Sequence, residues 1–349
     1  MRILWRWTKR LVLGLLGLVV LLLLPVGYVE LACTREPQSG DPYVPLVAPE
    51  WQRPESRTLT TYPEWHIVHA YDDYARVIAA GDPHDFGYLR AIAGFWTSLC
   101  PLKAQAGGMG GMTGDQKMTI YTIGVSFTAE LLAKAAYEET LGRTATLLRG
   151  SERAPLDDVS AEQAARYAAF LQQVPWYKWD FLADVEELRS QGGDGLRDRE
   201  RRVALGLEYR AKAAYAQQIE AAVAGMGEDA LRMRSVVTGV TMDDLALIDG
   251  VTVVGDREAG IEIETDRYRA FTRIAEHVAE AGGNFIEIAG NDDILFTALS
   301  SEPTFEDALF SFPLQASPDH RHLVLTPVAD LANRLRQPGS LRIEHVHDY

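Results

Sequence analysis

The stretch LVLGLLGLVVLLLLPVGYV, residues 11–29, decides how this chain is organised. It contains no charged residue, and as an α-helix at about 1.5 Å per residue it is about 28 Å long. That length matches the hydrocarbon core of a bilayer, which is roughly 30 Å thick. A helix satisfies its own backbone hydrogen bonds, which lipid cannot do. The stretch therefore predicts a transmembrane anchor at residues 11–29.

The flanking residues predict the orientation of this anchor. The basic segment 1–10 contains Arg2, Arg6, Lys9 and Arg10 and no acidic residue, and no basic excess follows Val29. Positively charged flanks stay on the cytoplasmic side of a membrane. We therefore expect the N-terminus in the cytoplasm and everything after Val29 outside it.

Two alternatives to an uncleaved anchor stay open at residues 30–33, Glu-Leu-Ala-Cys. A cleaved signal peptide has a shorter apolar core, about 7–15 residues, and a small-x-small cleavage site, whereas Ala32 is the one small residue here. A lipoprotein signal ends in a cysteine, and Cys33 fits that requirement. However, Glu30 occupies a position that is normally aliphatic. The sequence therefore favours retention of the segment as a signal anchor.

Composition limits the remaining possibilities. The chain has 349 residues, and the roughly 315 that follow the anchor exceed what one core usually holds, so we expect two domains. The formal net charge is −15, and because the first ten residues carry +4, the rest carries −19. Such acidity argues against nucleic-acid binding, which needs phosphate-neutralising Lys and Arg. It also argues against flat docking on anionic lipid.

The chain has two cysteines, Cys33 and Cys100. In an extracytoplasmic domain they could form a disulfide. Alternatively, Cys33 lies in a flexible juxtamembrane segment and Cys100 is a buried apolar residue on a helix. The sequence contains no Cys-x-x-Cys motif, which excludes thioredoxin-type and c-type haem chemistry.

Residues 30–57 are predicted to be a proline-rich linker. Prolines disfavour helix and sheet and favour an extended polyproline II chain of about 3.1 Å per residue. The linker could hold the folded part away from the bilayer, so that the anchor takes no part in its cores, or it could lie along the domain surface. Its prolines are Pro37, Pro42, Pro45, Pro49 and Pro54.

Residues 58–227 are predicted to form a helical domain. The capping box from Thr61 to Glu64 begins a helix that should end at Gly81. The aromatic cluster Trp176, Tyr177, Trp179 and Phe181 could bind a ligand, but such rings more often form core. The glycine-rich segment 107–114 is expected to be a mobile loop. Further helices are expected at 84–100, ended or kinked by Pro101, at 115–141, stopping at Gly142, at 160–174, and at 196–224, closed by Gly225 and Gly227.

The periodicity of the apolar residues changes at residue 228, and residues 228–349 are predicted to form a ferredoxin-like α+β domain. Strands are expected at 235–240, 251–254 and 261–265, then a helix at 267–281. Segments 284–288 and 294–299 flank Gly290-Asn-Asp-Asp293 and predict a hairpin. Further apolar segments at 308–314 and 322–325, a short helix at Pro327 and a strand at 341–347 complete the domain. No internal repeat of fixed period is visible. The predicted class is thus α+β with an N-terminal transmembrane helix.

Several blocks of the folded part resemble a family of uncharacterised bacterial single-pass membrane-anchored proteins with no assigned function. The resemblance implies an inner-membrane location, with the N-terminus cytoplasmic and the bulk of the chain periplasmic. It implies no mechanism, and the family pattern has aromatic residues near the positions of His66 and His69. The blocks are Tyr62-Pro-Glu-Trp65, Phe95-Trp96, Ser126-Phe-Thr-Ala-Glu130, Lys134-Ala-Ala-Tyr-Glu138 and Asp348-Tyr349.

The sharpest candidate site is His66, His69 and Asp73. At 100° per residue the three side chains fall within about 60° on one helix face. Two imidazoles and a carboxylate could hold Zn²⁺ or Fe²⁺ with positions left open. A polar helix face in solvent explains the same spacing equally well.

Weaker candidates each have a plain structural alternative. His345 and His347 share a strand face and could chelate a metal, as could His320 and His322. The Asn291-Asp-Asp293 turn could bind Ca²⁺, but it lacks the order of an EF-hand loop. The carboxylate pairs Glu138-Glu139 and Glu186-Glu187 could serve acid–base chemistry but are more simply surface residues. Met109 and Met112 could be soft copper ligands but are more simply part of a connector.

Two functional hypotheses follow. The chain contains no Gly-x-Ser-x-Gly, no Walker loop and no dinucleotide-binding glycine motif. The first hypothesis is therefore a non-enzymatic membrane-anchored extracytoplasmic protein that binds a protein partner or a ligand. The alternative is a metal-dependent enzyme that uses His66, His69 and Asp73. Catalytic and cofactor-binding residues are not otherwise identified.

Overall fold

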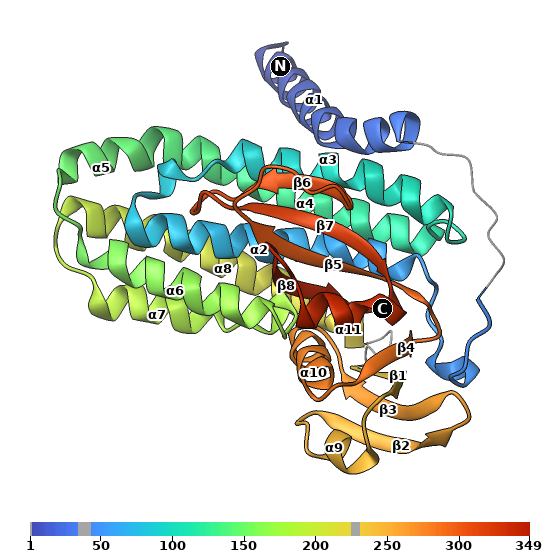
Figure 1. Cartoon of the computed structure of the whole chain (residues 1–349). Coiled ribbons are helices and arrows are strands. Elements are labelled where there is room, and N and C mark those ends of the chain that lie inside the picture. Colours follow the sequence, from blue (N-terminus) through green and yellow to red (C-terminus); the bar gives the residue numbers. More distant parts are fainter. Residues whose placement is uncertain (1, 34–42, 225–230) are drawn as a thin grey trace.

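The computed structural model describes residues 2–33, 43–224 and 231–349 (Figure 1). It is a mixed helix and sheet protein with one apolar N-terminal helix and antiparallel sheets, so the coarse α+β prediction is confirmed. The predicted boundary between the helical and α+β domains, at residues 227 and 228, lies outside the described residues. So do residues 34–42 of the predicted linker and the glycines expected to close the preceding helix.

Helix α1, Arg2–Ala32, contains the predicted anchor. The segment Thr8–Ala32 has a mean hydropathy of 2.6 and is long and apolar enough to cross a membrane. Its last turn is not free, because Val29 and Cys33 are buried in a core with α3 and α4. Cys33 forms a disulfide with Cys100, with Cα atoms 4.8 Å apart. The prediction that the anchor takes no part in the cores is therefore wrong at its last turn.

The predicted linker, residues 30–57, is wrong at its ends, because residues 30–32 belong to α1 and Arg57 begins α2. Residues 43–56 lie along the surface of the folded chain. The backbone amides of Leu46 and Val47 donate to the Glu287 carboxylate at 2.5 and 2.9 Å. Farther along, the Arg53 amide donates to the carbonyl of Ala289 at 2.9 Å. Residues 43–56 are thus held against the sheet region and do not act as a free spacer.

Seven helices of the described chain follow the linker. Helix α6 begins at Pro155, five residues before the predicted start, because proline suits the first helical turn. The predicted end at Gly142 is passed, and α3 continues through Pro101, the residue expected to end or kink it. The packing of Leu102 and Ala106 beneath the second sheet keeps the end of α3 helical. The helices are α2 Arg57–Ala80, α3 Tyr88–Gly107, α4 Gly114–Tyr137, α5 Arg143–Arg149, α6 Pro155–Leu171, α7 Phe181–Gln191 and α8 Leu196–Ala224.

At Gly142 the chain runs through a π-turn, Glu138–Gly142, that joins α4 to α5. A Cβ atom at Gly142 would collide with the Glu138 carboxylate, which is paired with Arg201. The glycine therefore makes room for a buried ion pair and does not end the helix. The glycine-rich segment is likewise no free loop. Met109 and Met112 pack against the core, and the Gly111 carbonyl accepts a hydrogen bond from Ser56 at 2.8 Å.

The C-terminal region contains two four-stranded antiparallel sheets, ordered β2-β3-β1-β4 and β6-β7-β5-β8. One hydrophobic core includes residues of both sheets and of helices α10 and α11. The strands are β1 Arg232–Thr238, β2 Val251–Arg257, β3 Gly260–Asp266, β4 Asn284–Ile288, β5 Asp293–Ser300, β6 Ala308–Pro313, β7 His320–Pro327 and β8 Arg342–His347. The helices are α9 Met242–Ala246, α10 Arg269–Glu280 and α11 Val328–Arg336.

The predicted hairpin around Gly290 is wrong, because β4 pairs with β1 and β5 pairs with β7 and β8. Ala289 and Gly290 both adopt positive φ, 52° and 84°, and redirect the chain from one sheet to the other. The Asn291 amide group donates to the carbonyls of Arg53 and Ala289 at 3.1 and 3.0 Å. The turn proposed as a Ca²⁺ loop is thus a hydrogen-bonded crossing between sheets.

Helices α2 and α3 cover one face of the second sheet (Figure 1). The contact is apolar at its centre, where Leu59 and Tyr62 of α2 meet Leu295 of β5 and Leu323 of β7. Burying such side chains contributes roughly 25 cal/mol per Å² of apolar area. This packing fixes which side of α2 faces the sheet, and it decides the surroundings of the candidate site.

Candidate functional site

The polar face of α2 is buried. His66, His69 and Asp73 are 3%, 6% and 5% exposed, because they lie where α2 packs on the second sheet. The interpretation of these residues as a solvated helix face is therefore wrong. The predicted sharing of one face is correct, but that face points to protein.

The structure brings the histidines of α2 together with those of β8. The His345 ring stacks on Trp65 of α2 with 3.4 Å between ring centroids. The His347 ring meets Tyr62 edge-on at 5.4 Å and lies 4.8 Å from the His345 ring. Two candidate groups from opposite ends of the folded chain thus form one cluster, which we call the histidine cluster: His66, His69, His345 and His347.

A β-bulge places a carboxylate beside this cluster. Pairing of β5 with β8 runs from Thr297–His345 to Ala298–Ile343, so Glu344 is the extra residue. Bulges commonly redirect a side chain next to a functional site. Here the Glu344 carboxylate accepts two hydrogen bonds from Arg321, at 2.5 and 2.7 Å, and lies 3.6 Å from Nε2 of His69.

The four imidazoles differ in how well their nitrogens are satisfied. Nε2 of His66 donates to the Ala91 carbonyl at 3.0 Å, and its Nδ1 accepts from the Tyr62 hydroxyl at 3.3 Å. In contrast, His69 and His345 each have one buried nitrogen without a hydrogen bond, and both nitrogens of His347 lack one. His66 is thus a core residue with both nitrogens hydrogen-bonded, while each of the other three has at least one buried nitrogen without a hydrogen bond.

Burial keeps the histidine cluster neutral. It lowers the pKa of His66 to about 4, and the pKa of His347 to about 3. Burial also lowers the pKa values of His69 and His345 well below the usual range, and the neighbouring Arg269 lowers both further. Desolvation disfavours the charged form of an imidazole, so all four rings are uncharged at neutral pH.

Asp73 lines a cleft of about 190 Å³ between α2, α3, β6 and β7, together with His66, Arg90, Phe312 and Arg321. Its Oδ2 accepts one long hydrogen bond from the Gln315 amide, at 3.4 Å, and its Oδ1 has no partner. Burial raises the pKa of Asp73 to about 6 despite the attraction of Arg321. The cleft thus holds a carboxylate whose hydrogen-bonding capacity is largely unused.

The metal triad predicted from the sequence is divided by the structure. His66 and Asp73 line the cleft, whereas His69 lies beside Glu344. In the described ranges, the group of three metal-type ligands within 4.8 Å of one another is Asp82, His84 and Asp85, and the predicted triad is not such a group. Metal binding by His66, His69 and Asp73 remains a prediction.

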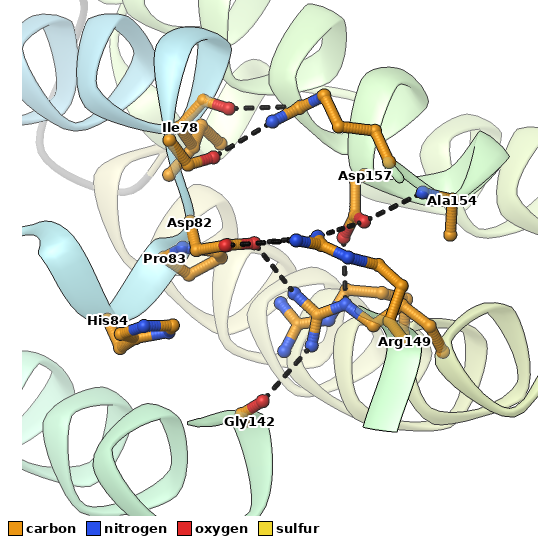
Figure 2. Close-up of polar contacts among 12 residues, drawn as sticks. Ile78, Asp82, Pro83, His84, Gly142, Arg149, Ala154 and Asp157 are labelled. Atoms are coloured by element: carbon orange, nitrogen blue, oxygen red, sulfur yellow. Dashed lines mark hydrogen bonds and ion pairs between the residues drawn. The ribbon is translucent and has the colours of Figure 1, made fainter. Parts of the chain in front are cut away.

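The group at Asp82 is part of a salt-bridge network, not a cation site (Figure 2). The Arg149 guanidinium donates to both Asp82 oxygens, at 2.8 and 3.1 Å, and to Asp157 at 2.7 Å. Arg197 lies 3.9 Å from Asp82 and donates to Asp157 at 2.8 Å. Arginines therefore already neutralise Asp82, one of the two carboxylates in this group, and they join the ends of α2, α5, α6 and α8.

Several other sequence candidates have structural roles. His322 bonds the hydroxyls of Ser300 and Ser311, at 2.9 and 2.8 Å. The aromatic cluster at Trp176 packs in a helical core with Tyr167. The sequence reasoning missed Trp65, Arg321 and Glu344, although Glu344 adjoins the strand histidines and an acid beside two histidines is a detectable signal.

Comparisons with known proteins add no relative. No protein-family model matches the chain, and neither the curated proteins nor the solved structures give a match. The fold and the site therefore stand alone in defining the class. They define a chain with one apolar N-terminal helix whose last turn is disulfide-linked to a folded part with a buried histidine cluster and a cleft.

Proposed function

We propose that this chain is a single-pass bacterial inner-membrane protein whose periplasmic part binds a small ligand in the cleft beside Asp73. The observation that carries the topology is the bond between Cys33 and Cys100. Disulfides persist in oxidising compartments and are rare in the cytosol. Cys33 stands four residues after the predicted anchor, so the bond supports an oxidising environment directly beyond it.

Cysteine accessibility tests this topology. In intact cells, a membrane-impermeant maleimide should label a Thr122→Cys variant, since Thr122 is exposed on α4 beyond the anchor. A Thr8→Cys variant, exposed before the anchor, should be labelled only after the cells are lysed. Native Cys33 and Cys100 should react only after reduction. Labelling of Thr8→Cys but not Thr122→Cys in intact cells would refute the orientation.

The ferredoxin-like architecture remains our proposal for residues 228–349, now in two units. Each sheet has its own strands in the order second, third, first, fourth, with neighbours antiparallel. The first unit has a helix after its first and third strands, α9 and α10, and the second has α11 after its third strand. This strand order supports two ferredoxin-like units related by duplication.

A metal-dependent enzyme is the second candidate. The unpartnered nitrogens of His69, His345 and His347, with Glu344 beside them, favour it. The positive charge of Arg321 argues against it, because, beyond the effect of burial, this charge lowers the pKa values of His69 and His347 and so lies close to their rings. A fixed positive charge beside the imidazoles opposes a bound cation.

Elemental analysis of the purified full chain ranks the two candidates. We expect less than about a tenth of an equivalent of zinc or iron, because a bound metal needs ligands that converge on one point. The His66→Ala/His69→Ala variant should give the same value. One equivalent of metal that disappears in this variant would make the enzyme the better proposal.

A further inference from the structure

The cleft contains one buried carboxylate oxygen without a hydrogen-bond partner, Oδ1 of Asp73. Asp73 is 5% exposed. Among the residues that line the cleft, all of them described, Asp73 is the one with a buried side-chain polar atom left unpartnered. A buried carboxylate without a partner is costly, so such groups are normally paired or bind a ligand.

The other charged groups facing the cleft do not supply this partner. Arg321 from β7 attracts Asp73, but it directs its two hydrogen bonds to Glu344 of β8 and donates none to Asp73. Arg90 of α3 is exposed at the edge of the cleft, where solvent screens its charge. The His66 ring has hydrogen bonds at both nitrogens and is neutral. Oδ1 of Asp73 therefore lacks a hydrogen-bond donor from any of these groups.

The walls suit a small ligand with an apolar body. Phe310 and Phe312 of β6 line the cleft, as do Ala70 and Ala91. The volume of about 190 Å³ is somewhat larger than a cavity of about 150 Å³ that holds benzene in another protein. The Phe312 ring already has the Arg321 guanidinium over it, 5.5 Å from the ring centroid, so it offers the ligand apolar contact.

We propose that the cleft binds a small primary amine, with its ammonium group on Asp73 and its apolar part against Phe310 and Phe312. This inference rests on the proposed binding function and specifies the class of ligand. The ammonium group would donate to Oδ1 of Asp73, which has no hydrogen-bond donor in the cleft. A carboxylate ligand of the same size would meet a like charge and should be rejected.

Isothermal titration of the full chain in nanodiscs tests the proposal with benzylamine. Benzyl alcohol, which has the same shape and no charge, is the matched probe. Asp73→Asn keeps the side-chain shape and should weaken benzylamine binding by at least about tenfold, roughly 1.4 kcal/mol. Asp72→Asn is the matched variant, because Asp72 already pairs with Arg76 at 2.6 Å. It should bind benzylamine within about twofold of the wild type.

Each outcome decides the proposal. Equal binding of benzyl alcohol and benzylamine, or an unchanged affinity in Asp73→Asn, would overturn it. An absence of benzylamine binding at about 10 mM would also overturn the proposal, because a dissociation constant above that concentration is too weak for a useful site. A melting temperature of Asp73→Asn at or above that of the wild type shows that the variant folds. The cysteine-labelling pattern is independent of all these results, so failure here leaves the proposed membrane topology standing.

Discussion

Acidification from about pH 6.5 to about pH 5 is expected to remove about 2 kcal/mol from the free energy of unfolding. The cause is the histidine cluster, which is buried and neutral in the fold. The pKa of His66 is about 4 and that of His347 about 3, against an ordinary value of 6.5. Between the folded and unfolded pKa values, the unfolded chain binds more protons, so stability falls as the pH falls.

The size of this stability loss follows from the pH range and the pKa values. At about pH 6.5 the unfolded imidazole is half protonated, so between about pH 6.5 and about pH 5 each of these two histidines contributes about 1.5 kcal/mol, since one pKa unit is about 1.4 kcal/mol. Asp73 acts in the opposite sense, because its raised pKa of about 6 lets the fold take up a proton first. This returns about 1 kcal/mol by about pH 5, so these three groups together give a net loss of about 2 kcal/mol. His69 and His345, whose pKa values are also lowered, add to the loss, and Asp348, whose pKa is raised by burial, reduces it.

Chemical denaturation of the full chain, followed by tryptophan fluorescence between about pH 5 and 7.5, measures this dependence. His347→Leu should remove about 2 kcal/mol of the pH-dependent loss, since one neutral imidazole no longer needs to be kept unprotonated. Both His347 nitrogens lack partners, so leucine forfeits no hydrogen bond. His277→Gln, at an exposed position on α10, is the control and should leave the curve unchanged. A His347→Leu curve parallel to the wild type would contradict the account.

The sequence predicts which residues share a helix face but not what covers that face. The 3.6-residue period places His66, His69 and Asp73 together, and polar residues on a helix usually face water. Here α2 is buried on that side by a sheet formed some 250 residues later. The pairing of β8 with β5 is a long-range contact, and local periodicity carries no information about it.

The same lack of long-range information explains why the predicted strand pairing is wrong. The apolar segments 284–288 and 294–299 identify β4 and β5 but not their partners, because a short turn between two strands usually makes a hairpin. Here Ala289 and Gly290 adopt positive φ and send the chain to another sheet. A residue other than glycine in that conformation is uncommon and gives no sequence signal. At the anchor, hydropathy predicts the spanning segment, whereas the disulfide that buries its last turn depends on α3 lying beside it.

Replacing Arg201 by alanine is expected to cost about 3–5 kcal/mol, as the removal of one partner from a buried ion pair does. Arg201 is 1% exposed and donates to Glu138 at 2.9 and 3.0 Å and to Glu200 at 2.8 Å. The variant leaves the Glu138 carboxylate buried without its cation. Urea denaturation of the full chain measures the loss.

A double variant separates the lost attraction from the stranded charge. Arg201→Met/Glu138→Leu should recover most of the stability, because an apolar pair of similar volume needs no desolvation compensation. Arg143→Ala is the surface control, since its pair with Glu139 is about half exposed and one helical turn apart, and it should cost only about 0.3–0.5 kcal/mol. If Arg201→Ala costs no more than Arg143→Ala, the buried pair does not hold the π-turn. The continuation of the chain from α4 into α5 past Gly142 would then depend on backbone propensity alone, which disfavours glycine inside a helix.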